Sequence, residues 1–137
     1  MDPKLKAAYD RIFARELVAR EQIYLEYPSF VVSAIPDRVG NAIPAGIIRR
    51  WRREQRVFAF RHRDHYFFPS FQFSEGAPKP IIGQLLRLVR PAHGWYAMYW
   101  FVAANGWLEA GAPVEYLDTD QAAVIEAACH ANDEISD

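Results

Sequence analysis

Prolines divide this chain into short segments and so limit where each helix and strand can run. Nine prolines are spread through 137 residues. A proline removes a backbone donor and pushes the residue before it out of the helical region. Pro28 therefore ends a first helix, Pro44 fits the start of a second, and Pro91 ends a third. We expect several short elements and one long helix at residues 3–27.

The long segment at residues 3–27 carries apolar side chains in a helical pattern. They recur at spacings of three and four: Leu5, Ala8, Tyr9, Ile12, Phe13, Leu17, Ile23 and Tyr24. Such a stripe is normally buried, either on the rest of the same chain or on a second subunit. The sequence does not separate these two arrangements, so a homodimer through this helix stays open.

Residues 44–54 predict a helix with two unlike faces. At about 100° per residue, Ile47, Ile48 and Trp51 lie within one arc, which should be buried. Four arginines lie together on roughly the opposite side: Arg49, Arg52, Arg53 and Arg56. This helix should therefore present a row of guanidinium groups to something outside the fold.

A β-hairpin is predicted directly after that helix. Two β-rich runs, at residues 57–60 and 65–69, flank a polar link at residues 61–64. Gly76, Pro78 and Pro80 then mark a loop and a boundary between residues 1–76 and residues 77–137. The second part is predicted to be helical, with a buried helix before Pro91, an apolar helix at residues 95–104 and a last helix beginning near Thr119.

Charge is divided sharply between these two parts. Residues 38–65 hold eight arginines against two acidic side chains, a net +6, whereas residues 109–137 hold eight carboxylates and no Lys or Arg, a net −8. Guanidinium groups match phosphate geometry, so the basic stretch is predicted to contact double-stranded DNA. The predicted contacts are Arg49, Arg50, Arg52, Arg53, Arg56, Arg61 and Arg63. The alternative is that these arginines pair with the acidic second half.

Phosphate contact is better supported by the sequence than base reading. Recognition helices usually read bases with their N-terminal residues. Here those residues are Pro44, Ala45 and Gly46, which offer almost no side-chain donors. We therefore expect contacts to the DNA backbone, which position a protein without specifying a sequence.

No catalytic or metal-binding pattern stands out in the sequence. We find no phosphate-binding loop, dinucleotide glycine fingerprint or nucleophile elbow. His62-Arg63-Asp64 matches only three letters of the kinase catalytic loop, in a chain far too short for a kinase. A tight turn rich in arginine is also a poor cation site. We therefore predict no enzyme activity, cofactor or metal.

Composition favours a cytoplasmic protein without a membrane partner. The single cysteine, Cys129, cannot form an internal disulfide and is expected to fill the core. The charged N-terminal residues do not form a signal peptide, and no apolar run approaches the roughly 18 residues that a membrane span needs.

Three stretches together resemble the Xre/MbcA/ParS-type antitoxins and their toxin-binding domain. Residues 48–53 followed by 57–60 look like the end of a recognition helix and the hairpin after it. Residues 66–73, with Gly76, Pro78 and Pro80, look like the connecting segment. Trp100-Phe101 with Asn105, Leu108, Pro113 and Leu117 looks like the C-terminal motif. Where the family usually has two glycines after the leucine, this chain has Glu109 and Ala110.

The resemblance implies a cytoplasmic antitoxin that represses its own operon and neutralises a partner toxin. In that family the partner is often a RES-type toxin that consumes NAD, and the antitoxin's C-terminal region can block the toxin's active site. The partner-binding residues implied on this reading are Asn105, Trp107, Leu108, Pro113, Asp133, Glu134 and Asp137. The last three would place carboxylates in a cationic nucleotide pocket of the toxin.

The predicted fold is mainly α, with a winged helix-turn-helix-like N-terminal half that contains one β-hairpin and a small helical C-terminal domain. The predicted function is that of an antitoxin-like DNA-binding protein. The alternative is a protein–protein interaction module that has lost DNA binding.

Overall fold

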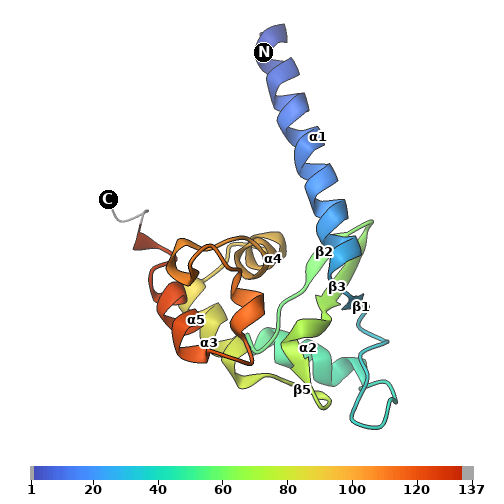
Figure 1. Cartoon of the computed structure of the whole chain (residues 1–137). Coiled ribbons are helices and arrows are strands. Elements are labelled where there is room, and N and C mark those ends of the chain that lie inside the picture. The colour runs from blue at the N-terminus through green and yellow to red at the C-terminus, as the bar shows by residue number, and fades with distance from the viewer. Residues whose placement is uncertain (1, 134–137) are drawn as a thin grey trace.

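A computed structural model describes residues 2–133 of the chain as mainly helical, with a small amount of antiparallel sheet (Figure 1). The predicted class, mainly α with a β-hairpin, is confirmed. In chain order the elements are α1 (Pro3–Glu26), β1 (Ser29–Phe30), α2 (Ala45–Arg53), β2 (Phe60–His62), β3 (His65–Pro69), the 3₁₀ helix η1 (Ser70–Gln72), β4 (Phe73–Ser74), β5 (Ala77–Pro78), α3 (Pro80–Val89), α4 (Gly94–Val102), the 3₁₀ helices η2 (Gly106–Leu108) and η3 (Pro113–Tyr116), and α5 (Gln121–Cys129).

Helix α1 begins at a capped proline and projects from the rest of the molecule (Figure 1). Asp2 caps it by accepting a hydrogen bond from the Lys4 backbone amide, and Pro3 occupies the first turn. Only its C-terminal end packs on the body, where Ile23, Tyr24 and Tyr27 lie against the larger core cluster. The N-terminal part of the helix stands in solvent.

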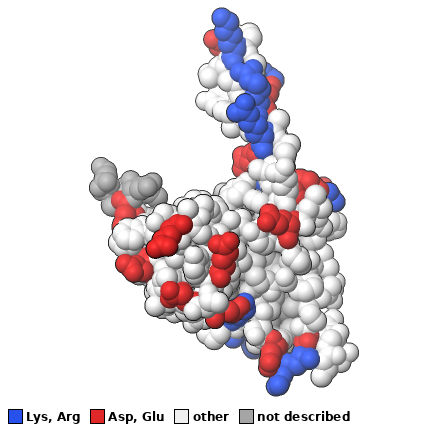
Figure 2. All heavy atoms as spheres, viewed as in Figure 1, with Lys and Arg blue, Asp and Glu red and all other residues white. Residues whose placement is uncertain are grey.

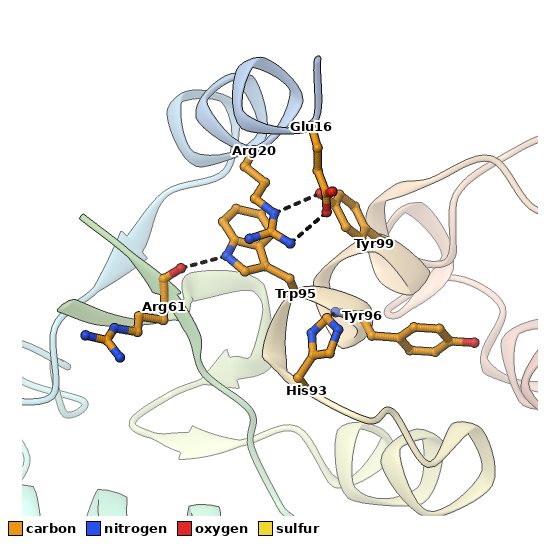
Figure 3. A network of polar contacts seen from close by, with 7 residues as sticks. All are labelled: Glu16, Arg20, Arg61, His93, Trp95, Tyr96 and Tyr99. Carbon is orange, nitrogen blue, oxygen red and sulfur yellow. Dashed lines mark hydrogen bonds and ion pairs between the residues drawn. The ribbon is translucent and has the colours of Figure 1, made fainter. Parts of the chain in front are cut away.

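The C-terminal end of α1 is fixed to α4 by a polar network (Figure 3). The Arg20 Nε donates to the Tyr99 hydroxyl at 3.2 Å, and its guanidinium lies 5.0 Å from the centre of the Trp95 ring. Burial disfavours the charged form of Arg20, but hydrogen bonds with Tyr99 and Glu16 outweigh it and raise the pKa of the side chain. The Trp95 Nε1 in turn donates to the Arg61 carbonyl at 2.6 Å, which joins α4 to the hairpin.

The predicted hairpin is present, with its turn two residues long. Strand β3 lies between β1 and β2, and β2 pairs with β3 from Phe60 opposite Phe67 to His62 opposite His65. Arg63 and Asp64 form the turn with φ of 50° and 62°. Two consecutive positive φ values are typical of the tight turn that matches the twist of paired strands.

The run at residues 57–60 separates two core clusters. Phe58 and Phe60 point into the larger cluster, which is completed by α3, α4 and α5. Val57 and Ala59 point into the smaller cluster, which is completed by Ile48 and Trp51 of α2 among others. The four side chains are all buried, as the two-residue period of an extended chain between two apolar layers requires.

Gln72 is the buried polar side chain that secures this run. Its Oε1 accepts from the Phe58 backbone amide at 2.8 Å, and its Nε2 donates to the Phe58 carbonyl at 2.9 Å. Gln72 has 0% exposure, and Phe58 lies just before the paired part of β2. The amide side chain therefore takes the place of a neighbouring strand, because buried backbone groups need partners.

The C-terminal helices pack as predicted. Ile81, Ile82 and Leu85 of α3 and Trp95 and Met98 of α4 are buried in the larger cluster. Val124, Ala127 and Ala128 of α5 face inward, and α5 lies against α3. Asp120, one residue after the predicted Thr119, caps α5 by accepting from the Ala123 amide at 3.2 Å.

Two details of the sequence interpretation need correction, and the structure defines one segment for which the sequence predicted no element. Ile47 was placed in the buried stripe of α2, but it is exposed because the stripe is covered only at Ile48 and Trp51. Cys129 is exposed at the end of α5 and does not fill the core. Residues 31–44 form no helix before α2; Asp37 instead closes a loop by accepting hydrogen bonds from the Val39 and Asn41 amides.

The likeness to a winged helix-turn-helix is therefore limited to α2 and the hairpin that follows it. No helix in residues 2–133 is both long and apolar enough to cross a membrane.

Replacing Gln72 by Leu should lower the free energy of unfolding by roughly 2–5 kcal/mol, because the Phe58 amide and carbonyl would be buried without partners. Urea unfolding followed by tryptophan fluorescence measures the change. The matched control is Gln84→Leu, on the exposed side of α3, which should change stability by less than about 0.5 kcal/mol. Equal effects of the two substitutions would show that the Gln72 amide does not secure Phe58.

Candidate nucleic-acid interface

Helix α2 exposes all four of its arginines because its apolar stripe is anchored in the smaller core cluster. Ile48 is fully buried and Trp51 nearly so. The arginines Arg49, Arg50, Arg52 and Arg53 are exposed on the rest of the helix surface, and Arg56 follows just after its end. Three of them lie in the last turn, where positive charge is favoured by the helix dipole.

Arg49, Arg50 and Arg53 have no ion-pair or hydrogen-bond partner for their side chains among residues 2–133. Other arginines form ion pairs: Arg38 with Glu75, Arg56 with Glu54, Arg61 with Asp64, and Arg63 with Glu21. None of the seven predicted arginines pairs with a carboxylate in residues 109–132. The acidic half therefore does not neutralise the basic face of α2 within the described chain.

Arg52 and Arg56 are held by aromatic rings. The Arg52 guanidinium lies 4.6 Å from the centre of the Tyr66 ring on β3, and that of Arg56 lies 5.7 Å from the Trp51 ring. Stacking of this kind restricts the side chain and leaves the guanidinium N–H groups available around its edge. These two arginines are thus positioned and still able to donate to an anion.

The hairpin arginines are engaged at the tip of the hairpin. Arg63 pairs with Glu21 of α1 and lies 5.3 Å from the Tyr24 ring, and His62 contacts the same carboxylate at 2.7 Å. Arg61 lies 3.5 Å from Asp64. Arg63 therefore helps to dock α1, and the candidate interface is centred on α2 and less on the hairpin tip.

A hollow beside α2 adds basic residues that the sequence did not single out. It has a volume of about 520 Å³ and lies between Arg52 of α2, the run 57–59, the end of α3 and the start of α4. Arg87, Arg90 and His93 line it together with Arg52. We define the arginine surface as Arg49, Arg50, Arg52 and Arg53 of α2 with Arg87 and Arg90 of the hollow.

Two backbone features shape that hollow. Arg90 ends α3 in the left-handed conformation, with φ of 51°, and its amide donates to the Leu86 carbonyl. A Cβ on Gly94, at the start of α4, would lie 1.9 Å from the Ala59 carbonyl oxygen, so only glycine fits there. The start of α4 is thereby pressed against the floor of the hollow, and His93 caps this helix by accepting from the Tyr96 amide at 3.2 Å.

The C-terminal motif forms a closed loop around Asn105. The Asn105 Oδ1 accepts from the Trp107 amide at 2.9 Å, and the Asn105 amide donates to the Gly111 carbonyl at 2.9 Å. Leu108 and Pro113 are buried, so they shape this loop and would not touch a partner on the surface. Asn105 is half-buried and acts through the loop in the same way.

Trp107 and Asp133 are brought together by a residue that sequence reasoning missed. Trp107 is 55% exposed, and its ring stacks on His130 with 3.6 Å between ring centres. His130 also contacts Asp133. Glu134 and Asp137 lie outside the described residues. On the face seen in Figure 2, acidic side chains gather over the C-terminal helical part, and basic ones are concentrated on α1.

Glu109 and Ala110 both adopt the conformation that glycine favours. Their φ values are 53° and 68°. Two residues with a Cβ therefore occupy a turn whose backbone conformation usually favours glycine. Non-glycine residues in this region carry strain of about 1–2 kcal/mol each.

Comparisons of this chain with protein-family models, with curated proteins and with solved structures returned no match.

Replacing Ala110 by Gly should raise the free energy of unfolding by roughly 0.5–1 kcal/mol, because the strain at φ 68° is relieved. The control is Ala103→Gly at the end of α4, where φ is −83° and glycine should lower stability by about 0.4–1 kcal/mol. Urea unfolding of both variants checks this. A loss of stability in both would mean that Ala110 is not strained in solution.

Proposed function

We propose that this protein is an antitoxin-like DNA-binding protein that holds DNA by its phosphates. The observation that carries the proposal is the arginine surface, in which Arg49, Arg50 and Arg53 have no partner among the described residues. Exposed, unpaired guanidinium groups on one helix face, continued by Arg87 and Arg90, suit a polyanion better than a single small ligand.

Recognition of a particular DNA sequence is not part of this proposal. The N-terminal residues of α2, Pro44, Ala45 and Gly46, offer no side-chain donors to base edges, and no helix precedes α2 closely enough to form the usual two-helix unit. Binding would therefore be mainly electrostatic, with the DNA backbone as ligand. Autorepression would then require an additional source of specificity, such as DNA shape or a second subunit.

Binding to a double-stranded DNA fragment should weaken steeply with salt, and Arg49→Gln/Arg50→Gln/Arg53→Gln should reduce that dependence. The slope of log K against log salt falls by about 0.9 for each phosphate contact, so the triple variant should be shallower by about 2.7. Fluorescence anisotropy across a salt series, with the chain's own upstream DNA and a scrambled duplex, measures both slopes.

The matched control is Lys4→Gln/Arg11→Gln/Arg15→Gln, which removes the same charge from the exposed side of α1. It should leave the slope unchanged. An equal loss in both triple variants would mean that only net charge matters, and no binding by the wild type at low salt would exclude DNA as the ligand.

The alternative function, a protein-binding module without DNA binding, is favoured by the C-terminal surface. Trp107 is a large aromatic side chain left exposed beside His130 and Asp133, and exposed tryptophans are enriched where proteins bind partners. The Asn105 loop that presents it lies in the stretch that resembles the C-terminal motif of the toxin-binding domain. A RES-type toxin in the cytoplasm is the partner that this reading proposes.

If this surface binds such a toxin, Trp107→Ala should weaken neutralisation by tenfold or more, since a truncated aromatic anchor typically costs about 2 kcal/mol. Growth of cells that co-express a RES-type toxin with each variant provides the readout, and calorimetry gives the affinity. Tyr96→Ala, another exposed aromatic residue on α4, is the control and should keep full neutralisation. Equal neutralisation by both variants would rule out this face as the toxin-binding site.

A further inference from the structure

The N-terminal part of α1 exposes more large apolar side chains than any other element of the described chain. Seven of the thirteen exposed large hydrophobic residues of the described chain belong to this one helix. Five of them share one face: Leu5, Tyr9, Ile12, Phe13 and Leu17. We call this face the α1 stripe. At about 100° per residue it covers an arc of about 140°.

Nothing in the described chain supports this part of the helix. No hydrogen bond or ion pair joins residues 3–19 to another element; the pairs Lys6–Asp10 and Glu16–Arg20 lie within the helix. In proteins most of the stability of a helix comes from packing of its apolar face. An exposed stripe on a projecting helix therefore needs a covering surface.

The α1 stripe lies on the same side of the helix as the C-terminal residues of α1 that pack on the body of the protein. Ile23 and Tyr24 lie in the same arc of α1 and pack on the larger core cluster. Arg20 and Glu21, next to them, bond to Tyr99 and to the hairpin tip. The C-terminal end of the face is covered by the body and the N-terminal end is not, so the uncovered part begins where the body stops.

We propose that the α1 stripe is covered by the same stripe of a second copy of this chain, packed antiparallel. Charge favours that occupant. Residues 3–15 carry four basic side chains and one acidic, a net +3, and residues 16–26 carry three acidic and one basic, a net −2. In an antiparallel pair that overlaps at residues 3–19, Lys6 of each copy lies beside Glu16 of the other, and the two helix dipoles are opposed.

The pairing has a definite register. A two-fold axis near Arg11 sets Leu5 of one copy opposite Leu17 of the other and Tyr9 opposite Phe13. The same register sets Lys6 opposite Glu16, which are of opposite charge. The overlap covers residues 3–19, a length of about 25 Å, so the two bodies lie at opposite ends of the paired helices and do not collide.

A parallel pair is disfavoured by the same features. It would set Lys6 beside Lys6 and Glu16 beside Glu16, and it would bring both bodies to one end. Figure 2 shows uncharged atoms beside the charged ones along the projecting part of α1. A C2 contact of one patch with itself is the commonest form of association between identical chains.

Sedimentation of the full chain over a wide range of concentration tests the pairing. We expect a monomer–dimer equilibrium in the wild type, and a monomer at all concentrations for Phe13→Glu, because a carboxylate would be buried in the stripe. The matched control is Val18→Glu, on the opposite side of the same helix and 58% exposed, which should remain a dimer. Circular dichroism verifies that each variant stays folded.

Disulfide trapping tests the direction, in a Cys129→Ser background so that no other thiol is present. A mixture of Leu5→Cys and Leu17→Cys chains should form the mixed disulfide, and Leu5→Cys alone should not cross-link. A monomeric wild type, a dimeric Phe13→Glu variant, or cross-linking of Leu5→Cys with itself would each overturn the proposal. None of these results depends on whether the arginine surface binds DNA.

Discussion

The pair of hydrogen bonds between Gln72 and Phe58 is the interaction on which the rest of the structure depends. The run 57–60 has an apolar layer on each side, and one buried amide side chain supplies the backbone partners that a strand would otherwise provide. That run holds α2 on one side and α3 with α4 on the other. It also forms the floor of the hollow, so the arginine surface takes its shape from this contact.

Much of the fold could be predicted because its signals are local. Proline positions and apolar spacing located α1, α2, α3, α4 and the hairpin to within a few residues. The errors concern side chains whose burial depends on how the elements pack against one another. Ile47 fits the apolar arc of α2, but the arc is covered only in part, and Cys129 lies on the exposed side of α5 although its neighbour Ala128 is in the core. The position of a side chain on a helical wheel shows which face of the helix it lies on. It does not show whether the rest of the protein covers that face.

Some residues of the candidate site could likewise be predicted from local sequence, and others could not. Arg49 and Arg53 were found from helix periodicity and Arg50 from the basic stretch of the sequence, because all three lie on one short helix. Arg87 and Arg90 were not, since only the packing of α3 beside the run 57–59 brings them near Arg52. Arg63 was assigned to DNA because it lies in a basic run. Its carboxylate partner, Glu21, is 42 residues away in the chain and could not be foreseen.

The central claim is that the arginine surface, and not the acidic C-terminal part, meets DNA. The most direct measurement is an NMR titration of the labelled protein with a short duplex at low salt. The account predicts that signals of α2 and of residues 87–94 shift first, including the arginine side-chain N–H groups, while those of Trp107 and His130 stay in place. No shifts at low salt, or the largest shifts around Trp107, would contradict it.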